Sequence, residues 1–107
     1  LTLFEHVQAG RFTVETVVEK TAHAPARLFG IRERGFIRDG YWADLVLVDP
    51  FTPTRDQPIY SKCGWSPFDD VVFSACVRMS WVNGELRYRD GSFHAGTGGR
   101  ALEFTRP

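Results

Sequence analysis

The sequence predicts an α+β fold in which short helices come first and short strands follow. Residues 1–30 carry apolar side chains at helical spacings of three and four, and from Gly35 onward the period changes to two. An alternating run then meets Asn83-Gly84, the dipeptide most typical of a two-residue hairpin turn. With 107 residues, 43% of them hydrophobic, the chain is long enough for one compact domain and too short for two of ordinary size.

Three short helices are expected in residues 1–30. Gly10 is a natural stop for the first helix, because glycine adopts the left-handed conformation after a helix without steric cost. Thr13 is a candidate N-cap for the second helix, which should end near His23. Pro25 suits the first turn of a third helix, closed by Gly30, since the N–H that proline lacks has no partner there. The apolar positions of the first two helices are Leu3, Phe4, Val7, Val14, Val17 and Val18.

Two strands and a long loop are expected next. Phe36-Ile37 is a candidate for a brief strand, and Asp39-Gly40 for the turn after it. Residues 43–48 are almost continuously apolar, which predicts a strand buried on both faces, and Asp49-Pro50 ends it. Residues 51–70 contain three prolines and have no clear period. They predict a long ordered loop, which in a compact domain is usually functional or docked on something.

The strongest local pattern is a β-hairpin. Residues 75–81 alternate, Asn83-Gly84 supplies a type I′ turn, and the return strand leads to Asp90-Gly91. The tail from Ala95 onward is rich in glycine and basic residues, so we expect it to be loosely held. Its candidate docking residues are Leu102 and Phe104. At the other end, Leu1 is not methionine and helical periodicity begins at once, so we expect the sequence to start inside a longer protein.

Composition narrows the classes of partner. Thirteen basic residues balance thirteen acidic ones without forming a block, so the chain lacks the field with which nucleic-acid binders attract phosphates. No apolar run approaches a membrane span, and the first residues do not resemble a secretory leader. Cys63 and Cys76 are expected to be reduced thiols, not a disulfide framework. We therefore expect a cytoplasmic protein that binds neither nucleic acid nor a membrane.

Histidine and cysteine residues do not form a recognisable site. His6, His23 and His94 lie far apart, and none belongs to a spacing that brings two ligands to one metal. We interpret them as partly exposed histidines that flank helices or satisfy local contacts. Cys63 has Lys62 beside it, which would lower the thiol pKa, but no base is within sequence reach. A structural cysteine is the favoured interpretation, and a nucleophile is the alternative.

Two pairs of acidic residues have both a chemical and a local interpretation. Asp44 and Asp49 flank a predicted strand as paired carboxylates would, but acidic residues at strand ends more often bond nearby backbone. Asp69 and Asp70 end the long loop, where a solvated turn is favoured over a cation site. The arginines interpreted as a solvated strand face are Arg32, Arg34, Arg38, Arg78, Arg87 and Arg89. These residues predict no catalytic, cofactor-binding or metal-binding residue in this chain.

Three spaced motifs resemble the C-terminal signature of the amidohydrolase superfamily. They are residues 24–30 (APARLFG), 35–40 (GFIRDG) and 43–49 (ADLVLVD), in that order. Residues 60–68 (YSKCGWSPF) are similar to the cyclic amidohydrolases, and most of all to bacterial dihydroorotases. Asp70 stands where these enzymes usually have glycine, and His23 where asparagine is common.

The resemblance implies a position for the chain within a larger enzyme. Residues 1–34 would be the last helices of a (β/α)8 (TIM) barrel, and residues 35–107 the C-terminal strands of a small β-sandwich with the proline-rich loop and the hairpin. Such enzymes bind zinc in the barrel through histidines, a carboxylated lysine and an aspartate, and none of these stands in this sequence. The chain alone would be inactive, as the structural portion of a dihydroorotase that interconverts dihydroorotate and carbamoyl aspartate in pyrimidine biosynthesis. Its partners would be the remainder of the same chain and further copies in a homo-oligomer.

Two alternatives stay open. The parent enzyme could be a hydantoinase, an allantoinase or a non-catalytic dihydroorotase homologue, which the sequence upstream would distinguish. The chain could also be a free-standing β-rich binding module that only resembles the family.

Overall fold

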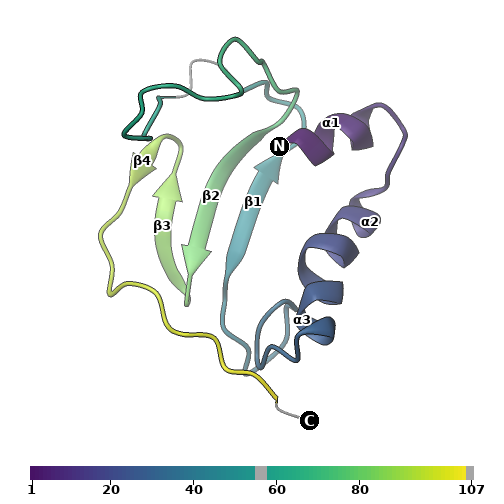
Figure 1. Cartoon of the computed structure of the whole chain (residues 1–107), viewed down its shortest axis with the longest axis vertical. Helices are drawn as coiled ribbons and strands as arrows, with labels where there is room; N and C mark the ends of the chain where they lie inside the picture. The colour runs from purple at the N-terminus through teal and green to yellow at the C-terminus, as the bar shows by residue number, and fades with distance from the viewer. Residues whose placement is uncertain (55–57, 106–107) are drawn as a thin grey trace.

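The computed structural model of the chain describes residues 1–54 and 58–105. Helices come first and an antiparallel sheet of four strands follows, so the α+β prediction is confirmed (Figure 1). The helical elements are α1 (Thr2–Gln8), α2 (Val14–Val18), the π-helical segment η1 (Glu19–His23) and α3 (Ala24–Leu28). The strands are β1 (Leu45–Asp49), β2 (Cys76–Val82), β3 (Glu85–Arg89) and β4 (Ser92–Phe93), and they are neighbours in sequence order.

The predicted helix stops at Gly10 and Gly30 and the predicted N-cap at Thr13 are confirmed. Gly10 and Gly30 both adopt left-handed conformations, with φ of 69° and 62°. At each, the glycine N–H bonds the carbonyl three residues back, and the next N–H bonds the carbonyl five residues back. This pair of bonds is the Schellman motif, which satisfies the last carbonyls of a helix. At the other end, Thr13 Oγ1 accepts a hydrogen bond from the Thr16 N–H at 3.2 Å, as an N-cap does.

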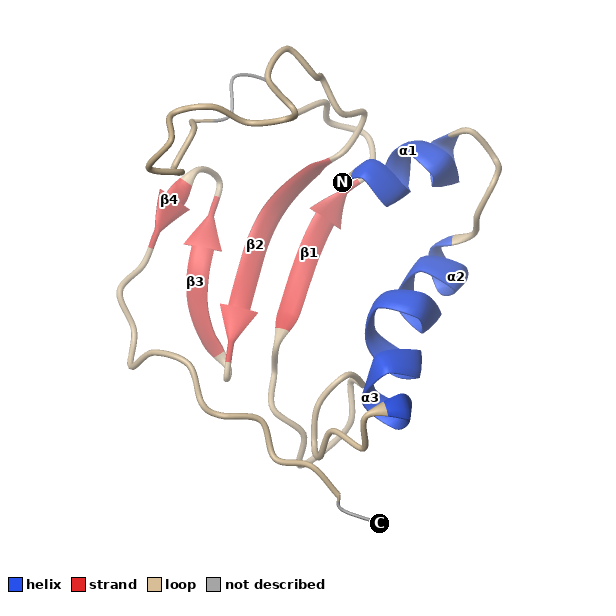
Figure 2. Ribbon diagram, viewed as in Figure 1, coloured by secondary structure: helices blue, strands red, loops and turns tan. Residues whose placement is uncertain are grey.

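The second and third helices are continuous, which corrects the prediction of two separate helices. α2, η1 and α3 follow one another without a break from residue 14 to residue 28 (Figure 2). Pro25 supplies the physical reason for the π-helical turn before it. Inside a helix proline offers no N–H and its ring crowds the carbonyl four residues back, and a wider turn relieves both problems.

The strand predicted at Phe36-Ile37 is wrong. Residues 35–37 belong to none of the four strands, and Gly35 and Phe36 lie against the helix instead. A Cβ atom built on Gly35 would lie 2.5 Å from the Ala26 Cβ, which shows how closely the backbone approaches. The Phe36 ring stacks on the His23 ring with centroids 4.3 Å apart. These helix contacts take the place of strand pairing.

β1 is confirmed as a strand, but its burial on both faces is wrong for this chain. The turn before it is found as predicted, with the Tyr41 N–H bonded to the Arg38 carbonyl at 3.1 Å. Within the described residues β1 pairs only with β2, and no helix has a Cα atom within 8 Å of a strand. Val46 and Leu47 are therefore 60% and 49% exposed.

The hairpin is confirmed in its turn type and its pairing. Asn83 and Gly84 both have positive φ, 52° and 83°, as a type I′ turn requires. β2 and β3 pair antiparallel on either side of this turn. Asp90 and Gly91, with φ of 46° and 89°, form a second turn of this kind that adds the short strand β4.

The chain has little core of its own. Among the described residues, Ala26 and Ala75 are the buried apolar ones. No large side chain of the described residues is fully buried. The accessible surface is 8217 Å², about 2,100 Å² more than a compact protein of 12.2 kDa exposes. The radius of gyration is 15.6 Å, against about 13 Å for a compact domain of this length. The helices and the sheet thus lie beside each other as an open structure (Figure 1).

Side-chain hydrogen bonds hold α1 to the segment that leads into β2. Glu5 Oε1 accepts from the Ser74 N–H at 2.6 Å and from the Ser74 hydroxyl at 2.7 Å. Directly after β1, the Pro50 carbonyl accepts a hydrogen bond from Gln8 Nε2 at 2.8 Å. The two bonds from Ser74 lower the pKa of Glu5 from its usual value of 4.5, because they favour the charged carboxylate.

This contact is expected to make stability depend on pH in the acid range. The folded-state pKa of Glu5 lies below its unfolded value, so the contact stabilises the fold above the unfolded pKa. That contribution is lost as pH falls through the folded-state pKa. We expect Glu5→Gln to unfold with a flatter pH dependence below neutrality, measured by urea titration from pH 2.5 to 7. The control is Glu33→Gln, which removes an exposed carboxylate from the linker, residues 29–44 between α3 and β1. Equal profiles for both variants would contradict the prediction.

Candidate functional site

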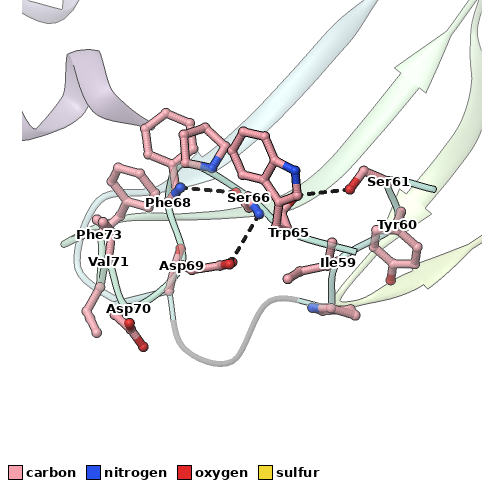
Figure 3. Close-up of a pocket in the computed structure, with 14 residues that line it drawn as sticks. Ile59, Tyr60, Ser61, Trp65, Ser66, Phe68, Asp69, Asp70, Val71 and Phe73 are labelled. Atoms are coloured by element: carbon pink, nitrogen blue, oxygen red, sulfur yellow. Dashed lines mark hydrogen bonds between the residues drawn. The ribbon is translucent and has the colours of Figure 1, made fainter. Parts of the chain in front are cut away.

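The long loop and the residues just after it line a half-open hollow of about 780 Å³ (Figure 3). Its lining includes four aromatic residues, Tyr60, Trp65, Phe68 and Phe73, and Trp65 and Tyr60 are 60% and 63% exposed. The loop is ordered by its own hydrogen bonds: Ser61 Oγ donates to the Trp65 carbonyl at 3.0 Å, and the Ser66 N–H donates to Asp69 Oδ2 at 3.2 Å. The predicted ordered loop is confirmed over residues 51–54 and 58–70, while residues 55–57 lie outside the described part. The polar lining residues include Ser61, Ser66, Asp69 and Asp70.

Cys63 lies outside the lining of this hollow. It is exposed, and its thiol contacts Ser61 Oγ at 3.2 Å and the Trp65 carbonyl at 3.7 Å. These contacts lower the pKa of the Cys63 thiol, and the hydrogen bond with Ser61 has the largest effect. The charge of Lys62, which was predicted to lower this pKa, is not the cause. A nucleophile also needs a base within reach. No histidine lines the hollow, and the contacts of Cys63 are those of a turn.

The two acidic residues at the end of the loop serve local structure. Asp69 accepts the Ser66 N–H, as the solvated-turn interpretation expects. Asp70 adopts a left-handed conformation with φ of 65°. Glycine takes up this conformation without cost, and aspartate tolerates it better than most residues do. The backbone conformation at Asp70 therefore favours glycine, the residue that the resembled family usually has at this position.

The three histidines have different neighbours. His6 Nδ1 lies 3.3 Å from an Arg11 guanidinium nitrogen, and His23 Nδ1 lies 3.5 Å from Glu19. His94 bonds the Arg87 carbonyl through its backbone N–H. In residues 1–54 and 58–105 no group of three or more His, Cys, Asp or Glu side chains is placed to hold a metal ion. These residues therefore do not fit a zinc site.

Asp44 and Asp49 do not act as a pair, because they lie at opposite ends of β1 and bind different groups. Asp49 caps the start of the loop: its carboxylate accepts the Phe51 N–H at 2.9 Å and the Thr52 hydroxyl at 2.8 Å. These two bonds lower the pKa of Asp49. Asp44 instead accepts the Asn83 N–H at 2.8 Å and pairs with Arg34.

Arg34 corrects the prediction that all six arginines form a solvated strand face. It precedes the sheet in the chain and is only 9% exposed. Its guanidinium donates to Asp44 and, at 2.7 Å, to Asn83 Oδ1. We call Arg34, Asp44 and Asn83 the Arg34 clamp. It joins the linker after α3, the start of β1 and the tip of the hairpin.

The other five arginines are exposed or half-buried, and only some of them lie on strands. Arg32 is exposed and precedes the sheet in the chain. Arg78 and Arg89 lie on exposed strand positions, as predicted, and Arg78 pairs with Asp90 at 3.0 Å. Arg38 lies on the linker, with its guanidinium 4.3 Å from the centre of the Phe36 ring. Arg87 is half-buried on β3.

No helix in the described part of the chain is both long enough and apolar enough to cross a membrane.

Comparison with known proteins finds relatives that are named as enzymes. No family model matches it. A dihydroorotase of Methanothermobacter thermautotrophicus is 33% identical over 94 residues, which are 86% of this chain and 22% of that protein. A dihydroorotase of Archaeoglobus fulgidus is 39% identical over 68 residues, 60% of this chain and 17% of that protein. A D-phenylhydantoinase of Escherichia coli K12 is 32% identical over 97 residues, 88% of this chain and 21% of that protein.

The chain thus belongs with the cyclic amidohydrolases, and the family predicted from its motifs is confirmed. Its relatives carry two names, dihydroorotase and D-phenylhydantoinase, at similar identity. The chain spans about one fifth of the length of the curated relatives it matches.

Proposed function

We propose that this chain is the C-terminal structural portion of a metal-dependent cyclic amidohydrolase, a cytoplasmic dihydroorotase that interconverts dihydroorotate and carbamoyl aspartate. The structural role rests on the accessible surface, which exceeds that of a compact protein of this mass by about 2,100 Å². The proposed dihydroorotase activity rests on the relatives that carry that name. An excess of this size is what a large and stable protein interface buries. The rest of a longer enzyme chain would supply the covering surface.

Apolar side chains are exposed on both the helical part and the sheet. Leu28 and Phe29, at the end of α3, are 78% and 63% exposed, and Ile37 is 86% exposed. β1 leaves one backbone edge unpaired within the described residues, and residues 45–48 carry no charge that would discourage another strand from pairing there. These features support residues 1–34 as the last helices of a barrel and residues 35–107 as strands that complete a sandwich.

The proposed zinc ion belongs to the remainder of the enzyme. The described residues here do not fit a metal site, so the ligands would come from chain outside this sequence. When bound, zinc would polarise a cyclic amide and its attacking water. The role of this portion would be to cover the barrel and support its shape.

The proposal is tested by comparing the parent enzyme with this chain alone. We expect the parent to hydrolyse dihydroorotate faster than phenylhydantoin, followed by ultraviolet absorbance. We expect the purified 107-residue chain to show no turnover of either compound and to retain no zinc after dialysis. Turnover by the chain alone would refute a purely structural role.

A hydantoinase is the second candidate parent. It is favoured by the D-phenylhydantoinase match, which extends over 88% of this chain. A preference of the parent enzyme for phenylhydantoin over dihydroorotate would establish this alternative.

The exposed apolar surface also predicts that the isolated chain self-associates. We expect a dimer or larger species in light scattering after size exclusion at micromolar concentration, because apolar patches and free strand edges associate in the absence of their partner. Leu47→Lys should shift the distribution toward monomer, since it places a charge on the exposed edge strand. The matched control is Val82→Lys at the exposed end of the inner strand β2, which should change it less. A monomeric wild-type chain would contradict the prediction.

A further inference from the structure

The C-terminal tail is hydrogen-bonded to two separate parts of the fold. Residues 94–105, which we call the tail strap, run from the end of β4 past β3 and back to the helical part (Figure 1). The first anchor of the strap is β3. The His94 N–H donates to the Arg87 carbonyl at 2.9 Å. The N–H and the hydroxyl of Thr97 donate to the Glu85 carboxylate at 2.9 and 2.7 Å. The strap therefore lies along the outer edge of β3, where another strand would otherwise pair.

The second anchor of the strap is the segment that follows α3. The Thr105 N–H donates to the Gly30 carbonyl at 2.7 Å, and the Arg32 N–H donates to the Glu103 carbonyl at 2.9 Å. These bonds form a short antiparallel bridge, which also corrects the expectation of a loosely held tail. The backbone of Phe104 lies opposite Ile31 in this bridge, but the side chains of Phe104 and Leu102, the two predicted docking residues, remain 52% and 45% exposed.

The middle of the strap contacts the Arg34 clamp. Asn83 Nδ2 donates to the Gly98 carbonyl at 3.4 Å, while Asn83 Oδ1 accepts from Arg34. The Arg100 guanidinium lies 4.6 Å from the centre of the Trp42 ring, and Arg34 lies 5.5 Å from the same ring. Arg34 and Arg100 also line one small hollow. The strap and the clamp thus share Asn83 and Trp42.

We propose that the tail strap is a releasable closure that covers the β3 edge and the Arg34 clamp as one unit. Three glycines in residues 96–99 give its middle few side-chain contacts, so the two anchors hold it. The anchoring side-chain contacts are exposed, and such contacts are individually weak. Losing one anchor should therefore loosen the other. Release would open the outer edge of the sheet and expose the clamp to water, independently of which reaction the parent enzyme catalyses.

Trypsin cleavage after Arg100 in the full chain tests the proposal, because the site lies between the anchors. We expect Thr97→Val to speed this cleavage about threefold, because it removes one exposed hydrogen bond and leaves the Thr97 N–H bond to Glu85 in place. The matched control is Thr52→Val, which removes a threonine bond to Asp49 outside the strap and should leave the rate unchanged.

Amide hydrogen exchange in the same variants tests whether the anchors are coupled. In Thr97→Val we expect faster exchange at Arg32 and Thr105, measured relative to the β2 amides, which report opening of the sheet. Faster cleavage together with this remote effect supports one closure. Unchanged exchange at the second anchor, or equal cleavage rates in both variants, would overturn the proposal.

Discussion

Replacing Arg34 with methionine is expected to destabilise the chain by about 3 kcal/mol. The guanidinium is nearly buried and donates to both Asp44 and Asn83. Methionine fills much of the same volume but leaves both acceptors without their donor. Removing one member of a buried ion pair costs more than the pair itself contributes, because the remaining charge stays poorly solvated. The Asp44 side chain is 38% exposed, which keeps the expected loss at the lower end of the usual range.

Urea unfolding followed by tryptophan fluorescence measures this loss. Arg89→Met is the matched control, because Arg89 is exposed on β3 and its replacement should change stability by less than about 0.5 kcal/mol. Arg34→Lys should fall between the two, since lysine keeps the charge but not the planar fork that reaches two acceptors. Similar losses for Arg34→Met and Arg89→Met would mean that the clamp is not a source of stability.

Features set by neighbouring residues could be predicted from the sequence. The helix stops at Gly10 and Gly30, the N-cap at Thr13 and the turn at Asn83-Gly84 each depend on a few adjacent residues, and the structure confirms all of them. The same local reasoning failed at Pro25. Its missing N–H is equally compatible with a new helix and with a π-helical turn inside a longer one, and the continuous helix is found.

Features that depend on distant residues could not be predicted. Arg34 meets partners 10 and 49 positions away, so an arginine in an alternating segment gave no sign of burial. β1 was expected to be covered on both faces because its residues are apolar, but the cover is absent from the described residues. The sequence pattern of β1 is typical of a strand in a larger assembly, which agrees with the proposed role.

The candidate site shows the same division. The long loop was predicted from its prolines and lack of period, but the meeting of Tyr60, Trp65 and Phe68 around one hollow depends on turns within the loop. The separation of the histidines followed from their spacing, and each has a different neighbour in the structure. The hollow brings aromatic side chains together with Asp69 and Asp70, and no histidine lines it.

Gly35→Ala is expected to destabilise the chain by about 3 kcal/mol, because two costs combine. Gly35 has a φ of 80°, where any side chain is strained. An added Cβ would also lie 2.5 Å from the Ala26 Cβ and 2.9 Å from the Ala22 carbonyl oxygen, so the linker and the helix would have to separate. That separation would displace Phe36 from His23 and move the linker that carries Arg34.

Gly40→Ala separates the two costs. Gly40 has the same φ of 80°, but a Cβ built there meets nothing within 4 Å. We expect it to lose about 1 kcal/mol, the strain alone, in the same urea titration. The difference between the two variants then measures the close approach of the linker to the helix. If both variants lose the same amount, the contact between Gly35 and Ala26 is not tight in solution. The larger loss at Gly35 would instead show that this glycine is needed because the backbone packs directly on the helix.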